Sequence, residues 1–305
     1  MNEDKHAAGL RREKQSMNTN TYPPMDLKLA VSRLDSLPAM PVIAQKLLAL
    51  RLDNDQDEQQ MLLLIAQDPL ISARIIGLAN SPMAGSSRKI GTVKDASLLL
   101  GLKRVQSVAT GLALMSQMNK SVGRLNIPAL WVHNMSIAFA MLAIVHAMPA
   151  KKRINDDLTF LAGMLHDVGY SVLAHLDVER SDELQTRMIT EPNRLALEIE
   201  REIVGITHDE LGAELASHWN LPEEIVSAIR FHHDVEKAGS TQPMARIINL
   251  AEKLLPSFGF SELIETVITP EDWQALGIDP ERAEEIGALV AEQAEQASQF
   301  ASSFG

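Results

Sequence analysis

The chain has 305 residues, of which 46% are hydrophobic and 4% aromatic, and it carries a formal net charge of −12. A chain of this length can bury a substantial core, and its acidic charge repels phosphates over most of the surface, which argues against nucleic acid as a partner. It contains no cysteine, which excludes disulfides and thiolate chemistry. Abundant Leu, Ala, Ile, Met, Glu and Gln favour helix over sheet, so the composition predicts an all-α fold.

The N-terminal segment, residues 1–22, is polar and shows no hydrophobic periodicity, so we expect a disordered leader. Met17 offers an alternative start to Met1. The leader lacks the apolar centre of a secretory signal. The apolar run 137–145 is shorter than a membrane span. We therefore predict a cytoplasmic protein that does not contact the membrane.

The first part of the chain, residues 23–122, has the hydrophobic spacing of a helical subdomain. We expect helices around 42–52, 61–65, 70–76, 92–100 and 102–118. Asp68 and Pro69 separate the second helix from the third, because Asp can cap a helix and Pro fits its first turn. We find no Gly-rich phosphate loop, no strand-turn-helix unit and no internal repeat in this part.

The second part, residues 123–255, is also predicted to be helical. A helix begins near Pro128, and its apolar residues share one face with His133, which therefore points inward. The next apolar stripe, 158–165, places His166 just after it, with Gly169 as the expected helix terminator.

Three further helices carry the remaining polar candidates. Residues 207–210 (THDE) form a capping box, which puts His208 in the first turn of a helix. A helix that begins at Pro222 aligns the pair His232-His233 with its apolar residues. A last helix, over 245–255, carries Asn249 and Glu252 on one face.

The C-terminal residues, 256–305, show two more helical patterns, over 270–276 and 280–300. Both are rich in Glu and Gln. We therefore expect a C-terminal helical extension that forms a peripheral cover.

The histidines are the residues that most strongly indicate chemistry, because they fall at the ends or on the inward faces of separate predicted helices. Imidazoles and carboxylates on separate rigid elements are what a metal site in a helical bundle requires, and a bound ion could activate water against a phosphoester. The alternative is that each imidazole is an interior polar group that is bonded to the backbone or to a carboxylate.

The order of these residues resembles the ligand order of the HD superfamily of phosphohydrolases, and of its HD-GYP branch in particular. The resemblance implies the metal ligands His133, His166, Asp167, His208, His232, His233 and Glu252. Glu252 stands where that branch has Asp, Tyr170 stands where it has Lys, and residues 234–239 (DVEKAG) replace its Gly-Tyr-Pro motif. Because this set contains more imidazoles than carboxylates, it suits a divalent transition metal such as Fe, Mn, Zn or Ni better than calcium.

Four motifs of the first part resemble the HDOD domain, a signalling relative of the HD enzymes. They are 37–41 (LPAMP), 66–70 (AQDPL), 78–81 (LANS) and 99–102 (LLGL). The resemblance covers 34–255. It implies an HDOD domain over 23–255, in which an N-terminal helical part (23–122) packs on an HD-like helical bundle (123–255). It also implies a degenerate metal site and a regulatory role in bacterial signalling.

Three functions are compatible with these patterns. The first is a signal transduction protein that binds a protein partner and retains a vestigial or structural metal site. The second is a metal-dependent phosphohydrolase that acts on a nucleotide or cyclic dinucleotide, with Asp167 as its catalytic residue and a phosphate-containing small ligand in its site. The third is a scaffold without metal. The missing Lys and Gly-Tyr-Pro favour the first over the second.

Overall fold

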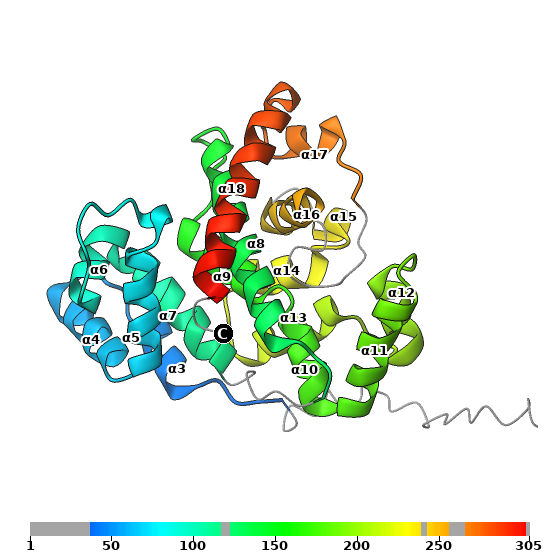
Figure 1. Cartoon of the computed structure of the whole chain (residues 1–305), viewed down its shortest axis with the longest axis horizontal. Coiled ribbons are helices and arrows are strands. Elements are labelled where there is room, and N and C mark those ends of the chain that lie inside the picture. The colour runs from blue at the N-terminus through cyan, green and yellow to red at the C-terminus, as the bar shows by residue number, and fades with distance from the viewer. Residues whose placement is uncertain (1–36, 117–122, 239–242, 256–265, 303–305) are drawn as a thin grey trace, which may run out of the picture.

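The protein is all-helical in the residues that the structure, a computed structural model, describes: 37–116, 123–238, 243–255 and 266–302. Figure 1 shows the N-terminal helices gathered at one end of the long axis and α11 with α12 at the other end. No strand occurs in the described ranges. The predicted all-α fold is therefore confirmed, while the predicted leader, 1–22, lies outside the described residues.

The N-terminal part consists of short helices that are separated by caps. These are α3 (Val42–Ala49), α4 (Asp55–Ala66), α5 (Pro69–Ala79), the 3₁₀ turn η2 (Pro82–Ala84), α6 (Val93–Leu100) and α7 (Leu102–Ser116). The side chain of Asp68 accepts hydrogen bonds from the first backbone amides of α5, as predicted. The first predicted helix ends three residues early, at Ala49, because Leu50 is extended and Leu52 has a positive φ of 55°.

The second part surrounds the longest helix, α8 (Ile127–Ala147). It continues through α9 (Asp156–Leu165), α10 (Val168–Leu176), α11 (Val178–Thr190), α12 (Ala196–Ile203), α13 (His208–His218), α14 (Glu223–Phe231), α15 (Val235–Ala238) and α16 (Pro243–Leu254). After the undescribed residues 256–265 come α17 (Pro270–Ala275), η3 (Pro280–Arg282) and α18 (Ala283–Ser302). The predicted capping box at Thr207 is present and opens α13.

Helix α8 lies at the centre of this part and is buried on nearly every side by α9, α16 and α18. Among the described helices, it alone is long and apolar enough to cross a membrane as one unbroken helix, with a mean hydropathy of 1.6, but 78% of that window is buried inside the protein. Two sharply bent helix pairs in the N-terminal part would pass the same test only if each were counted as one span. The apolar segment is thus longer than the expected run 137–145, and its packing within the protein accounts for its composition.

Helix α18 corrects the expectation of a peripheral cover. It packs lengthwise on α8 and buries an apolar stripe that includes Ile286 and Val290. The hydroxyl of Ser136 donates a hydrogen bond to the carbonyl of Ala294 at 3.2 Å. The Glu and Gln side chains lie on the outward face of an amphipathic helix, so their abundance does not indicate that the helix is dispensable to the core.

Gly169 corrects a second expectation, because it does not terminate a helix. Helix α9 ends at Leu165, and Gly169 lies inside α10. A Cβ atom at Gly169 would lie 1.9 Å from the carbonyl oxygen of His208, so the missing side chain allows α10 and α13 to touch backbone to backbone. This close approach brings the start of α13 beside the segment between α9 and α10.

Candidate metal centre

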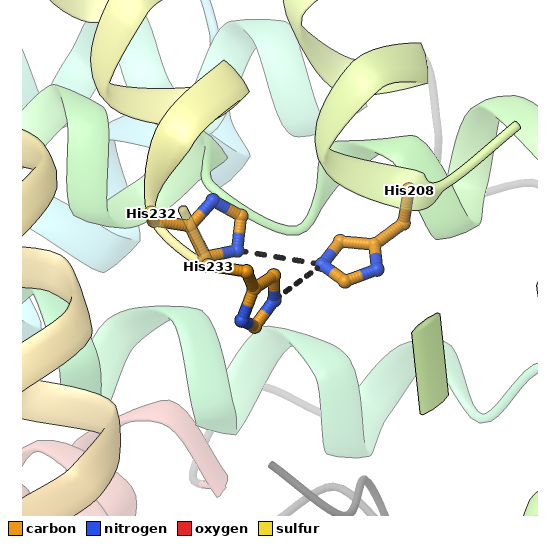
Figure 2. A group of neighbouring side chains, drawn as sticks. All are labelled: His208, His232 and His233. Atoms are coloured by element: carbon orange, nitrogen blue, oxygen red, sulfur yellow. Dashed lines mark hydrogen bonds between the residues drawn. The ribbon is translucent and has the colours of Figure 1, made fainter. Parts of the chain in front are cut away.

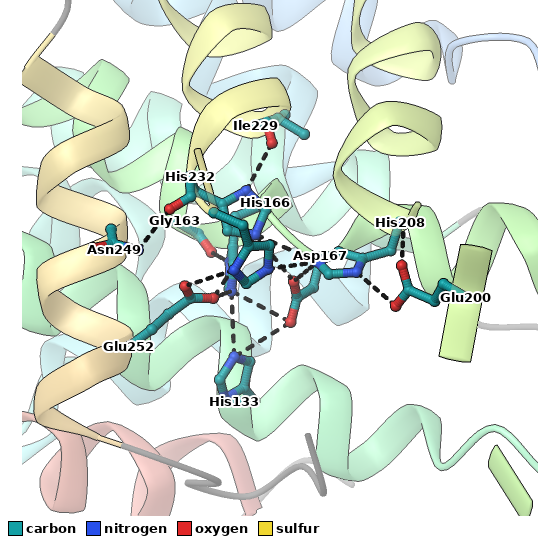
Figure 3. A network of polar contacts seen from close by, with 11 residues as sticks. His133, Gly163, His166, Asp167, Glu200, His208, Ile229, His232, Asn249 and Glu252 are labelled. Carbon is teal, nitrogen blue, oxygen red and sulfur yellow. Dashed lines mark hydrogen bonds and ion pairs between the residues drawn. The ribbon is translucent and has the colours of Figure 1, made fainter. Parts of the chain in front are cut away.

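The seven candidate ligands come together from six helices or the segments next to them. Figure 3 labels six of the seven, and His233 is labelled in Figure 2. His133 projects from α8, His166 and Asp167 connect α9 to α10, His208 begins α13, His232 and His233 follow α14, and Glu252 lies in the last turns of α16. Six of them are buried, and His233 is at an intermediate level of burial. The convergence that the sequence predicted is therefore present.

The first group consists of His133, His166, Asp167 and Glu252, whose ligand atoms all lie within 4.8 Å of one another. One oxygen of Asp167, Oδ2, lies 3.3 Å from the Nε2 atoms of both His133 and His166. Oε1 of Glu252 lies 3.3 Å from Nε2 of His166. Two ligands on one ion at bonds of about 2.0–2.2 Å are separated by roughly 3.0–3.5 Å, so these spacings fit a shared ion.

The second group consists of His208, His232 and His233 (Figure 2). Nε2 of His208 lies 3.4 Å from Nε2 of His232 and 3.1 Å from Nε2 of His233. The other oxygen of Asp167, Oδ1, lies 3.3 Å from Nε2 of His208 and 3.9 Å from Nε2 of His232. Asp167 therefore presents one oxygen to each group, the arrangement of a carboxylate that bridges two ions.

Hydrogen bonds at Nδ1 orient the rings around this bridge. Nδ1 of His166 donates to the carbonyl of Gly163 at 2.8 Å, and Nδ1 of His232 donates to the carbonyl of Ile229 at 2.7 Å. Glu200, in α12, accepts from both Nδ1 and the backbone N–H of His208, each at 2.8 Å. Such outer partners fix the tautomer and turn Nε2 toward a metal.

The sequence did not single out Glu200 or Gly163 as part of the site. Glu200 is one of several acids in its helix, and only the tertiary packing shows that it is 1% exposed and bonded to a ligand. A Cβ at Gly163 would lie 2.6 Å from Cα of Ala138 in α8, so this glycine lets α9 approach α8 closely enough for His166 to reach His133. Asn249 lies three positions before Glu252 in α16, and its side-chain N–H donates to the carbonyl of His232 at 2.8 Å.

The charges of the centre are balanced between carboxylates and imidazoles. Burial opposes charge on Asp167, but His166 and its neighbours hold the pKa of that carboxyl well below its usual range. Burial also opposes charge on His166, yet Asp167 and Glu252 raise its pKa to about 10. Burial lowers the pKa of His232 and of His233, which favours the neutral imidazole that a metal requires.

Two observations fit a cation between these groups. Both oxygens of Asp167, and Oε2 of Glu252, are buried without an ordinary hydrogen bond. In their neutral forms, His208 and His232 carry the proton on Nδ1, so that each turns an unprotonated Nε2 toward the other. Facing lone pairs repel unless a positive ion lies between them. The donor set of imidazole and carboxylate suits a divalent transition metal.

A cavity of about 330 Å³ reaches the centre at His233, its least buried ligand. Its wall includes Arg201, Arg230 and Lys237. Each of these cations is already paired with an acid: Arg201 with Glu210 at 2.8 Å, Arg230 with Glu214 at 2.7 Å and Lys237 with Asp234 at 2.6 Å. The cavity thus contains cations whose charge is compensated locally.

Tyr170, at the position where HD-GYP enzymes have Lys, is buried and stacks on His208 with ring centroids 4.4 Å apart. It supports the orientation of a ligand and adds no positive charge. His146, His175 and His218 lie outside both groups, and His146 instead contacts Asp156 at 2.8 Å.

Comparison with known proteins agrees with this architecture. The model of the HDOD domain matches residues 37–235, so the chain belongs to the HDOD family. An uncharacterized protein of Treponema pallidum (strain Nichols) is 28% identical over an alignment of 218 positions, which covers 69% of this chain and 41% of that protein. The chain therefore spans less than half of that relative's length.

Solved structures show the same fold. An HDOD domain protein of unknown function from Geobacter sulfurreducens has a TM-score of 0.71 at 24% identity, covering 88% of this chain and 98% of the other. A candidate signal transduction protein from Marinobacter aquaeolei VT8 has a TM-score of 0.73 at 24% identity. The match covers 98% of this chain and 66% of that one. A candidate phosphohydrolase from Shewanella amazonensis SB2B has a TM-score of 0.70 at 20% identity. The match covers 90% of this chain and 97% of that one.

Proposed function

We propose that this chain is a cytoplasmic regulatory protein of bacterial signal transduction that binds divalent transition metal ions, one in each ligand group, with Asp167 between them. The observation that carries the metal assignment is the inward pair of Nε2 atoms on His208 and His232, beside the oxygens of Asp167, which have imidazole neighbours at 3.3 Å but no ordinary hydrogen bond. Iron, manganese, zinc and nickel are the ions that this donor set suits.

A regulatory role is favoured over rapid hydrolysis by the residues around the centre. Bound ions would supply an activated water and part of the positive charge that phosphoester hydrolysis needs. In many enzymes a phosphoryl-transfer transition state is stabilised further by cations from the protein. Tyr170 is uncharged, and the cavity cations are paired with acids. We therefore expect the protein to act through a protein partner in a signalling pathway.

The second candidate function is metal-dependent hydrolysis of a nucleotide or cyclic dinucleotide. The observation that favours it is the cavity at His233, whose three cations would face a phosphate-containing small ligand. In that function Asp167 would be the catalytic residue, because it lies between both ligand groups and would orient the attacking water.

Metal analysis of the full chain tests the proposal. Protein that is treated with chelator, reloaded with Mn²⁺ or Zn²⁺ and desalted should retain metal, measured by plasma mass spectrometry. Asp167→Ala should lose most of it, because both groups depend on that carboxylate. His175→Ala changes an exposed histidine outside the centre and should retain the wild-type content. Equal metal in wild type and Asp167→Ala would contradict the assignment.

Turnover assays on the same samples separate the two functions. We expect no hydrolysis of cyclic dinucleotides or nucleoside phosphates above roughly 1 per second, the low end of ordinary enzymes. A faster rate that is abolished in Asp167→Ala and kept in His175→Ala would replace the regulatory proposal with the enzymatic one.

A further inference from the structure

A second cavity, of about 270 Å³, lies where the N-terminal helices meet α8 and α18. It is formed near the C-terminal end of α8, and one of its wall residues, His146, is thirteen positions after the candidate ligand His133. At the rise of an α-helix this separation is about 20 Å, whereas the nearest wall residue of α8, Phe139, lies about 9 Å along the helix from His133. None of the seven candidate ligands lines the cavity, so it is distinct from the metal centre.

The walls of this cavity are mostly apolar and come from three parts of the chain. Leu78 comes from α5, Phe139 and Leu142 from α8, and Leu289 from α18. Apolar walls with a few placed polar groups are the usual composition of a small-molecule site. A ligand here would contact both the N-terminal part and the HD-like part at once.

The polar side of the cavity contains the guanidinium of Arg104, which forms an ion pair with Asp156 but no hydrogen bond to any of the described residues. Asp156 accepts from Nε2 of His146 at 2.8 Å, whereas the closest approach of Arg104 to Asp156 is 3.6 Å. The Arg104 side chain is 23% exposed, so part of its guanidinium can be reached from the cavity. An acceptor on a ligand would supply the hydrogen bond that Asp156 does not provide at this distance.

We propose that this cavity binds a small amphipathic carboxylate, with its aliphatic chain against Leu78 and Leu142 and its carboxylate on Arg104. A guanidinium prefers a carboxylate because the two form charge-assisted hydrogen bonds in matching planes. The cavity volume of about 270 Å³ is just below the usual range of small-molecule sites, about 300–1,000 Å³, which suits a chain of medium length. This site is independent of the proposed metal function.

Calorimetric titration of the full chain with octanoate tests the site, with 1-octanol as the uncharged counterpart. We expect one octanoate per chain and weaker binding of 1-octanol. Arg104→Gln should weaken octanoate binding about tenfold or more, because a hydrogen bond to a charged group is lost. Lys103→Gln removes the same charge from the adjacent, exposed position of α7 and should change affinity less than twofold.

Chelator-treated and metal-loaded samples are compared in the same titration, since a carboxylate could also bind a metal. Equal octanoate affinity in both supports the cavity. Absence of saturable binding at millimolar octanoate would overturn the proposal, as would equal affinity of wild type and Arg104→Gln. Binding that disappears on chelation would assign octanoate to the metal centre and would also overturn it.

Discussion

At the scale of single residues, the geometry of the candidate centre depends on carboxylates that contact its imidazole rings. Glu200 holds His208 through two hydrogen bonds, and Asp167 lies between two imidazole groups. The sequence predicted that these side chains would converge because their order resembles a known pattern. It did not predict Glu200, because an acidic residue eight positions before a histidine has no periodic relation to it until helices α12 and α13 pack.

Removing the carboxylate of Glu200 should weaken metal binding without removing a ligand. We expect Glu200→Gln to lower affinity for the second group by about tenfold to a hundredfold, the usual effect of losing an outer partner. The matched control is Glu202→Gln, the same change in the same helix at a half-exposed surface ion pair. Competition with a fluorescent chelator measures both, and equal affinities in the two variants would contradict this role.

Metal affinity should rise with pH because the first group must release a proton. The pKa of His166 is raised to about 10 in the metal-free protein, so between pH 7 and 9 the ring is protonated and must lose that proton to bind through Nε2. His232 and His233, whose pKa values are lowered by burial, release none. We expect affinity to increase about tenfold per pH unit over this range. Titration in two buffers of different ionisation enthalpy would report the proton, and an affinity independent of pH would contradict the expectation.

At the scale of helices, the spacing of apolar residues predicted most elements but not how closely they approach. The capping box at Thr207 and the Asp68 cap follow from local chemistry and are present. Gly169 was misassigned as a terminator because a glycine after an apolar stripe is typical of a helix end. In the structure, Gly169 allows α10 to contact α13 closely, and a contact between two helices cannot be predicted from a local sequence pattern.

Gly169→Ala should destabilise the protein, since the new Cβ would overlap the carbonyl of His208. We expect a loss of about 1–3 kcal/mol or more in the free energy of unfolding, the usual cost of overpacking. Gly111→Ala is the matched control in another buried helix, where a new Cβ would meet Met164 at an ordinary 3.5 Å. Urea unfolding followed by circular dichroism measures both, and equal stabilities would show that α10 and α13 are not constrained there.

At the scale of the whole molecule, the N-terminal and HD-like parts are joined by direct contacts. The indole N–H of Trp219 donates to the carbonyl of Pro38 at 2.8 Å, and Ser107 donates to the carbonyl of Asp157 at 2.6 Å. The C-terminal helix α18 is also built into the core along α8. Its integration could not be foreseen from its acidic composition, because half of its buried residues are alanines, which give a weak apolar pattern.

These contacts predict one cooperative unit. Differential scanning calorimetry should show one unfolding transition with equal calorimetric and van't Hoff enthalpies. Two separated transitions, each reproduced by an isolated half, would indicate independent domains.

The location of bound metal tests the central claim most directly. Anomalous X-ray diffraction from crystals grown with Mn²⁺ or Zn²⁺ should show a peak on each side of Asp167, one near His133 and His166 and the other near His208 and His232, at bonds of about 2.0–2.2 Å. Crystals with metal in excess that show no peak between these residues would contradict the account.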